Sequence, residues 1–367
     1  MCLELIIRFY HRMHLRRDCS RDWLMACGNT WPRAGGNAEL FCSGRGQCPR
    51  RRQQLRFHAR GAAAASELLA TARFGRVNCG NRISQGELTS AADFCALRAH
   101  LMDLTVAIPV FNEELAIFRS VSSVLNQSWG GSYEILIVDD GSTDGTVEAV
   151  ERLSEQFPQI RLVRHARNLG RPAARSTLAR EARGLWYAML DADDEWYPNK
   201  LERQFALIAE LEAEGIDTSK LMVCGNIHHV DRDTGEERVK NFYQGYGVEG
   251  YDAARVLKGD NAPISQFALL RSEFAREIGE FDADLKRAQD WDFLIRFFLK
   301  GGQTVWLPNP PLALFNFRRG GRNADEIERC MMRVIDKHLP EYGRHSLDPD
   351  AVRRSIRGYI DSFRQEN

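Results

Sequence analysis

The chain has 367 residues, enough for one large α/β domain with additions or for two or three average domains. Its 50 basic and 50 acidic residues cancel, but residues 1–101 carry a net charge of +9 and the remainder carries −9. Seven of the nine cysteines lie in that first segment, and the other two, Cys224 and Cys330, are far apart. Such sparse cysteines favour a reducing, cytoplasmic compartment. No run approaches the roughly 18 apolar residues of a membrane span.

Residues 1–101 contain 16 arginines, no lysine and no sustained apolar periodicity. Three functions suit such a segment: an arm that binds nucleic acid or an anionic membrane, an organellar transit peptide, or a zinc site. The abrupt change of composition at Met102 instead favours an extension translated from an upstream, non-native start. We predict that residues 1–101 form a disordered or non-native N-terminal extension, and that the working domain starts at Met102.

From Met102, short apolar runs alternate with segments of helical periodicity. The first helix is predicted to turn Leu115, Phe118, Val121 and Leu125 toward the core. Strands are predicted at residues 103–110, 134–138, 159–164 and 185–190, with helices at 115–125, at 147–157 and after Pro172. Strands and helices that alternate at this spacing indicate βαβ units and a mostly parallel sheet.

Paired aspartates follow two of these strands. Asp139 and Asp140 follow the second strand, and Asp191 and Asp193 follow the fourth. Because parallel strands end at the same edge of a sheet, we expect these four side chains around one crevice. Four carboxylates repel one another unless a cation or a hydrogen-bonding ligand compensates them. Oxygen ligands of this kind suit Mg²⁺ or Mn²⁺.

Helix capping is the competing interpretation of the acidic cluster, with Asp194 or Asn199 as the cap of a helix that begins near Pro198. Further along, helices are predicted at residues 200–214, 272–278 and 293–299, and strands at 221–230, 238–243, 264–270, 305–307 and 312–317. The glycine- and tyrosine-rich residues 243–251 suit a surface loop better than an acceptor-side lid. Two amphipathic helices, one from Ala324 through Lys337 and one at residues 350–363, end the chain. Composition leaves open whether they pack on the domain, form a dimer contact or touch a membrane.

Several strings occur in a characteristic order: TVAIPVFNEE, EILIVDDGSTDGT, RNLGRPAARS, LDADDEW and LLRSEFAREIGEFDADLKRAQDWDFLIRF. Together, over residues 102–317, they resemble family 2 glycosyltransferases. The resemblance implies the GT-A fold, a Rossmann-like α/β architecture in which helices flank a mixed, mostly parallel sheet, here followed by C-terminal helices. It implies a GT-A domain at residues 102–320, with a nucleotide-binding half at 102–197 and an acceptor half at 198–320. Residues 321–367 then form a C-terminal helical segment.

The resemblance also implies an activity, the inverting transfer of a sugar from a nucleoside diphosphate sugar, expected to be a UDP-sugar, to an acceptor hydroxyl. The nucleotide-binding positions it implies are Pro109, Phe111, Glu113, Asp139, Asp140, Arg175 and Asp191. Asp191 and Asp193 would hold Mg²⁺ or Mn²⁺, and Asp290 would be the catalytic base. The expected partners are the donor and a glycan or lipid-linked acceptor in polysaccharide or glycoconjugate synthesis, not nucleic acid, with peripheral contact at the inner membrane face left open.

Alternatives accompany several of these assignments. Arg175 also suits a solvated helix face, and Asp290 or Asp292 also suits a helix N-cap. Gln289 stands where the family usually has Glu, which leaves fewer carboxylates to raise the pKa of the base. Basic residues at 318 and 319 suggest an anion site, although the His that related enzymes often carry there is missing.

Two other functions compete with sugar transfer. A sugar-phosphate nucleotidyltransferase has a related fold, but it should carry a glycine-rich, basic loop after the first strand, where this chain has FNEE. A non-catalytic protein that binds nucleotide sugars would share the binding residues and lack the base.

Overall fold

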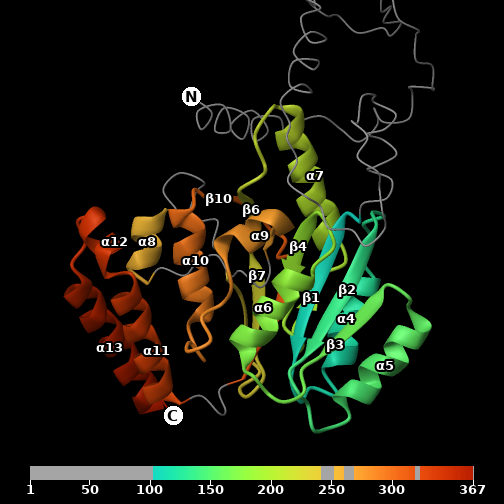
Figure 1. Ribbon diagram of the computed structural model, residues 1–367, viewed down its shortest axis with the longest axis horizontal. Coiled ribbons are helices and arrows are strands. Elements are labelled where there is room, and N and C mark those ends of the chain that lie inside the picture. The colour runs from blue at the N-terminus through green and yellow to red at the C-terminus, as the bar shows by residue number, and fades with distance from the viewer. Residues whose placement is uncertain (1–101, 241–251, 260–267, 319–322, 367) are drawn as a thin grey trace, which may run out of the picture. The chain divides into compact units, whose positions relative to one another are not determined.

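The structure is a computed structural model that describes residues 102–240, 252–259, 268–318 and 323–366 (Figure 1). The expectations for residues 1–101, for the loop at 243–251 and for Arg319 lie outside these ranges. The described strands form two sheets. The larger has the order β10-β6-β9-β4-β1-β2-β3, and the smaller has the order β5-β11-β7-β8.

The first half of the domain is a parallel βαβ array. Its elements are β1 (Leu104–Val110), α4 (Ile117–Leu125), β2 (Tyr133–Asp139), α5 (Thr146–Gln156), β3 (Ile160–Arg164), α6 (Arg171–Glu181) and β4 (Trp186–Met189). β1 pairs in parallel with both β2 and β4, and β2 pairs in parallel with β3. The predicted alternation is therefore confirmed, and the carboxyl ends of these strands share one edge of the sheet.

The second half extends the same sheet and adds a second one. β9 (Leu269–Arg271) runs antiparallel between β4 and β6 (Leu221–Gly225), and β10 (Gln303–Leu307) is parallel to β6. The helices of this half are α7 (Lys200–Ala213), α8 (Ala253–Leu257), α9 (Ser272–Ile278) and α10 (Gln289–Leu299). The larger sheet is thus mixed and mostly parallel, as predicted.

The single strand predicted at residues 221–230 is wrong, because it is two strands in different sheets. β6 ends at Gly225, and β7 (Ile227–Asp231) joins the smaller sheet with β5 (Glu195–Trp196), β8 (Glu237–Lys240) and β11 (Ala313–Phe317). At the junction, a Cβ on Gly225 would lie 2.4 Å from Leu312 Cδ1. A continuous apolar run gives no sign of where the chain passes from one sheet to the other.

The apolar stripe predicted for the first helix is also partly wrong. Leu115 and Phe118 are 84% and 60% exposed, whereas Ile117, Val121 and Val124 are buried. α4 begins only at Ile117, so the face turned to the sheet is offset from the predicted one. Leu115 and Phe118 therefore lie on the surface, beside the loop that follows β1.

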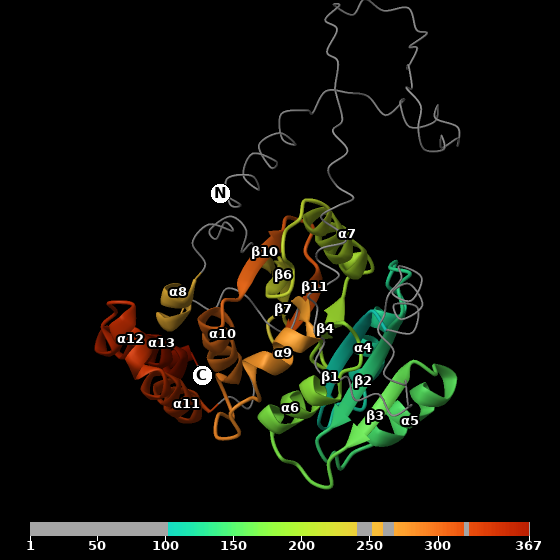
Figure 2. The ribbon, with the colours of Figure 1, turned by 45° about the horizontal axis from the view of Figure 1, so that its top comes forward.

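The C-terminal segment forms three helices instead of the predicted two: α11 (Ala324–Lys337), α12 (Leu339–Arg344) and α13 (Pro349–Glu366). They pack beside α10 and α8 (Figures 1 and 2). Val334 and Ile356 belong to the same buried cluster as Trp291 of α10. Of the three options for this segment, the structure therefore shows packing on the domain.

Two hydrophobic clusters cover the opposite faces of the larger sheet. Residues of β2 alternate between them: Leu136 and Val138 join α6, α10 and the C-terminal helices, while Ile135 and Ile137 join α4, α5 and α7. Burial on both faces explains why these strands are continuously apolar. Among the helices within the described ranges, none combines the length and the apolar character needed to cross a bilayer.

Candidate active site

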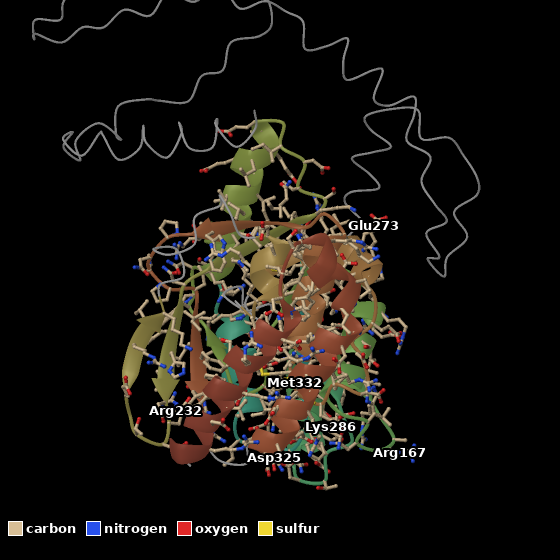
Figure 3. The ribbon with its side chains drawn as sticks, turned by 90° about the vertical axis from the view of Figure 1, so that its left-hand side faces the viewer. Arg167, Arg232, Glu273, Lys286, Asp325 and Met332 are labelled. Carbon is tan, nitrogen blue, oxygen red and sulfur yellow. The ribbon has the colours of Figure 1, made fainter. Side chains whose placement is uncertain are left out.

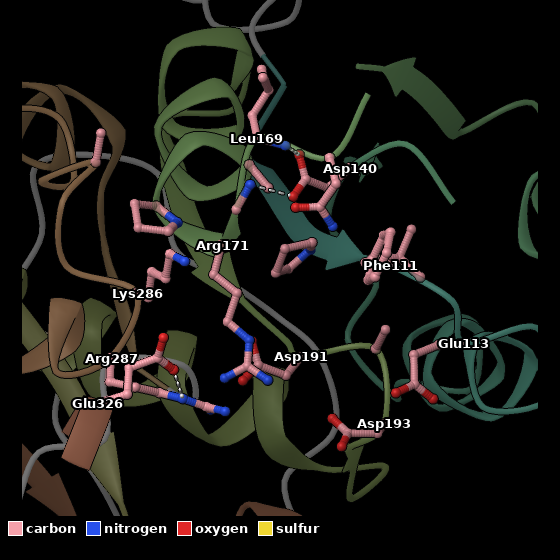
Figure 4. Close-up of a pocket in the computed structure, with 18 residues that line it drawn as sticks. Phe111, Glu113, Asp140, Leu169, Arg171, Asp191, Asp193, Lys286, Arg287 and Glu326 are labelled. Atoms are coloured by element: carbon pink, nitrogen blue, oxygen red, sulfur yellow. Dashed lines mark hydrogen bonds and ion pairs between the residues drawn. The ribbon is translucent and has the colours of Figure 1, made fainter. Parts of the chain in front are cut away.

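A cavity of about 530 Å³ opens at the carboxyl edge of β1, β2 and β4 (Figure 4). This volume lies within the range of small-molecule sites, about 300–1,000 Å³. Six of the residues predicted to bind the nucleotide or a metal line it, namely Pro109, Phe111, Glu113, Asp140, Asp191 and Asp193. The sheet brings them together because each follows, or ends, a parallel strand.

Asp140 organises the loop that leads into α6. Its carboxylate accepts hydrogen bonds from the backbone N–H groups of Leu169 (3.0 Å) and Gly170 (2.7 Å), and it lies 2.7 Å from His165 Nδ1. Gly170 has φ of 94°, a conformation that favours glycine. No sequence motif predicted that His165 would contact Asp140. The contacts of Asp140 fix one wall of the cavity.

Asp139 differs from its neighbour. It is 1% exposed, and both of its carboxylate oxygens lie within hydrogen-bond distance of Ser142 N, at 3.2 and 3.3 Å. It does not line the cavity in this structure. Of the four aspartates expected around one crevice, Asp140, Asp191 and Asp193 line it.

Arg175 is buried under the cavity floor at 3% exposure, so the solvated-face interpretation is wrong. Its Nη2 donates to both oxygens of Asp191, at 3.0 and 3.2 Å. Burial alone would lower the pKa of Arg175, but the charges of Asp191 and, more weakly, Asp290 outweigh it, and the pKa lies above its usual value. Arg175 therefore stands within electrostatic reach of both carboxylates.

Asp193 and Glu113 have raised pKa values, although Arg318 lowers both of them in part. Burial, reinforced by Asp191, raises the pKa of Asp193, and burial, reinforced by Asp193, raises the pKa of Glu113. Neither side chain makes an ion pair with a residue in the described ranges. The carboxylate oxygens at this end of the cavity are of the kind that a hard divalent cation prefers, and Asp193 and Asp191 are the residues that could hold one.

That fit rests on two carboxylates and not on a preformed cage. Within the described residues, no group of three or more His, Cys, Asp or Glu side chains gathers in a metal-binding arrangement. The capping alternative is not realised here either, because Asn199 makes no side-chain cap bond and Asp194 is fully buried, accepting from Asn316 N at 2.8 Å.

Asp290 lies in the first turn of α10, half-buried, and accepts a hydrogen bond from Trp291 N at 2.9 Å. The N-cap position is Ala288, which has no side-chain cap bond. Asp290 is not among the residues that line the cavity, and Arg175 connects it electrostatically to the strand-end aspartates. Gln289 beside it is buried, and its Oε1 has no hydrogen-bond partner within the part of the chain described.

Asp292 has a structural environment. It is fully buried, and it accepts from Arg296 Nε at 2.9 Å and lies 2.9 Å from both Lys337 Nζ and His338 Nε2. These partners outweigh burial and lower its pKa to about 2. The N-cap interpretation of Asp292 is therefore wrong, since the carboxylate joins α10 to the C-terminal helices.

The cavity also has a wall that the sequence interpretation missed. Arg171, Lys286, Arg287 and Glu326 line it, and they come from α6, from the loop before α10 and from α11 (Figure 4). Arg171 stands inside the recognised string RNLGRPAARS, so its position carried a signal. Glu326 is more than 130 residues beyond the acidic pair and carried none.

Comparisons with known proteins agree with this architecture. The model of the family described as "Glycosyl transferase family 2" matches residues 105–279. The succinoglycan biosynthesis protein ExoO of Rhizobium meliloti is 34% identical over 270 residues, which span 71% of this chain and 74% of ExoO. The chain belongs to glycosyltransferase family 2.

Other relatives match over shorter lengths. The uncharacterized glycosyltransferase YibD of Escherichia coli is 34% identical over 133 residues, which span only 36% of this chain and 36% of YibD. Among solved structures, S. aureus TarS in complex with UDP superposes with a TM-score of 0.54 at 18% identity, covering 72% of this chain and 74% of that one. The fold is thus the GT-A fold implied by the sequence.

Proposed function

We propose that the chain transfers a sugar from a nucleoside diphosphate sugar to an acceptor hydroxyl, with inversion at the anomeric carbon, in polysaccharide synthesis. The observation that carries the proposal is the placement of Arg175, which binds Asp191 at the cavity and stands within electrostatic reach of Asp290. A donor site and a candidate base thereby share one buried cation. The complex of TarS with UDP supports a UDP-sugar donor, and the name of ExoO supports a polysaccharide product.

The residues divide the work as follows. Asp140 holds the loop before α6, and Phe111 offers an exposed ring at the cavity. Asp191 and Asp193 would hold Mg²⁺ or Mn²⁺, which when bound neutralises charge on a departing diphosphate. Arg175 fixes the orientation of Asp191.

Asp290 accepts the proton of the acceptor hydroxyl while the hydroxyl oxygen bonds to the anomeric carbon. The bond from that carbon to the diphosphate oxygen breaks on the opposite face, and the nucleoside diphosphate leaves. A single displacement of this kind inverts the centre. It needs no second, nucleophilic carboxylate.

Asp290→Asn tests this mechanism. The amide cannot accept the proton, so we expect transfer to fall by about 10²–10⁴-fold. UDP affinity and melting temperature should hardly change, because Asp290 does not line the cavity. Steady-state transfer from UDP-sugars, calorimetry with UDP and thermal melting measure the three quantities on one variant.

Asp284→Asn is the matched control. Asp284 precedes α10 by a few residues and makes an exposed ion pair with Arg333. Its loss should leave transfer unchanged. Near-normal turnover in Asp290→Asn would exclude Asp290 as the base and would require a base at another position.

A further inference from the structure

The missed wall of the cavity carries unpaired positive charge. Arg171 is the first residue of α6. Lys286 lies in the loop before α10 and is labelled in Figure 3. Neither side chain makes an ion pair or hydrogen bond with a residue in the described ranges. Two of the cavity's acidic groups already have partners: Asp140 accepts from the backbone of its loop, and Asp191 pairs with Arg175.

A third cation on this wall is only loosely held. Arg287 Nε lies 3.7 Å from Glu326 Oε2, and both side chains are 27% exposed. That distance is too long for a hydrogen bond, so the pair is a weak, solvent-accessible one. Figure 4 shows the guanidinium groups of Arg171 and Arg287 both directed into the cavity. An arriving anion would therefore compete with Glu326 for Arg287.

The basic wall and the acidic end act on the same space. Arg171 and Asp193 line the same cavity. A group placed between them would meet carboxylates suited to a cation on one side and free cations on the other. A phosphate or diphosphate has the charge and the acceptor oxygens for that position.

We propose that Arg171, Lys286 and Arg287 form an anion subsite that binds a phosphate or diphosphate group, with Glu326 as a competing carboxylate that the ligand displaces from Arg287. The inference deepens the proposed function and rests on it for the source of the ligand. The group belongs either to the donor, as its diphosphate, or to an acceptor linked through phosphate. The three cations come from two separate parts of the chain, α6 and the loop before α10, and line one cavity.

Binding measurements on the full chain, with divalent metal chelated, test the subsite. The probes are inorganic pyrophosphate, UDP and uridine. We expect Arg171→Ala and Lys286→Ala each to weaken pyrophosphate binding by about 3- to 10-fold, the effect of removing a partly exposed charge-assisted hydrogen bond. Uridine affinity should not change, because it lacks the anion.

Glu326→Gln gives a prediction of opposite sign. Removal of its charge frees Arg287, so pyrophosphate should bind several-fold more tightly. Arg152→Ala and Lys258→Ala are matched controls, because both residues are exposed and lie outside the cavity. They should leave every affinity unchanged, and thermal melting should show that all variants are folded.

The two sources give different results. If the subsite holds the donor's diphosphate, UDP affinity falls together with pyrophosphate affinity in the Arg171→Ala/Lys286→Ala double variant. If it holds an acceptor's phosphate, UDP affinity stays constant, and pyrophosphate still binds to the UDP-saturated wild type but not to the UDP-saturated double variant. Unchanged pyrophosphate affinity in the double variant would overturn the subsite. If Glu326→Gln bound pyrophosphate with the affinity of the wild type, Arg287 would not belong to the subsite. These readouts involve no turnover, so they stand or fall separately from the role of Asp290.

Discussion

Single residues in this chain take their roles from what compensates their charge. Asp191 and Asp193 are two positions apart, yet Asp191 is neutralised by the buried Arg175 and Asp193 is not. A half-buried carboxylate that makes no ion pair within the described residues is a group that a metal ion would stabilise. Substitution of Asp193 is therefore a more direct test of the metal proposal than substitution of Asp191.

We expect Asp193→Asn to abolish the gain in UDP affinity that Mn²⁺ provides, because a neutral amide replaces a charged hard ligand. The loss should be about 10–100-fold or more, since even outer-shell partners of a metal contribute that much. UDP affinity without metal should change little. Calorimetry with and without Mn²⁺ measures both, and Glu195→Gln, outside the cavity, is the control. Retained Mn²⁺-dependent affinity would rule out Asp193 as a ligand.

At the scale of elements, α10 packs in one hydrophobic cluster with α6 and with the C-terminal helices. Its Asp290 is the proposed base. Asp292, two residues later, accepts from Arg296 in its own helix and lies 2.9 Å from Lys337 Nζ and His338 Nε2 of the C-terminal segment. Trp291 between them donates from Nε1 to Val256 O at 2.6 Å. The helix that carries the proposed base is thus joined to Lys337 and His338 of the C-terminal segment.

Asp292→Asn should destabilise the fold with a defined pH dependence. The folded pKa of about 2 lies below the usual 3.8, so the carboxylate stabilises the fold above about pH 4, and this contribution is lost as the pH falls toward 2. The difference corresponds to about 2 kcal/mol. Urea unfolding of wild type and variant should therefore differ at pH 6 and converge at low pH. Asp361→Asn, in an exposed pair with Arg364, should match wild type throughout. An equal difference at every pH would contradict the ion-pair account.

At the scale of the whole molecule, the described residues contain two large hydrophobic clusters on one mixed sheet. The members of both hydrophobic clusters lie between Leu104 and Ile360. The strand that follows Met102, β1, is an interior strand of the larger sheet, between β4 and β2. We therefore expect a protein that starts at Met102 to unfold cooperatively at the same temperature as the full chain and to bind UDP equally well. Titration calorimetry measures the UDP affinity, and differential scanning calorimetry measures the unfolding temperature. A truncated protein that is insoluble, or that has lost UDP affinity, would show that residues 1–101 contribute to the fold or the site.

The sequence by itself determined the strand ends and the acidic groups that follow them. Apolar runs, turn residues and their alternation are local properties, and parallel connectivity then forces Asp140, Asp191 and Asp193 to one edge. The same reasoning placed Asp139 beside them, although its carboxylate bonds Ser142 in its own turn. Strand order and direction predict which residues are near the edge, but not which way each side chain turns.

The tertiary structure decided what depends on contacts between distant segments. Leu312 packs closely on Gly225 where the chain passes from β6 to β7, and the buried Arg175 pairs with Asp191. Glu326 of α11 lines the cavity, and His338, the residue after α11, contacts Asp292 of α10. No local pattern encodes such contacts, because their free energy comes from groups that only the folded chain brings within a few ångströms of each other.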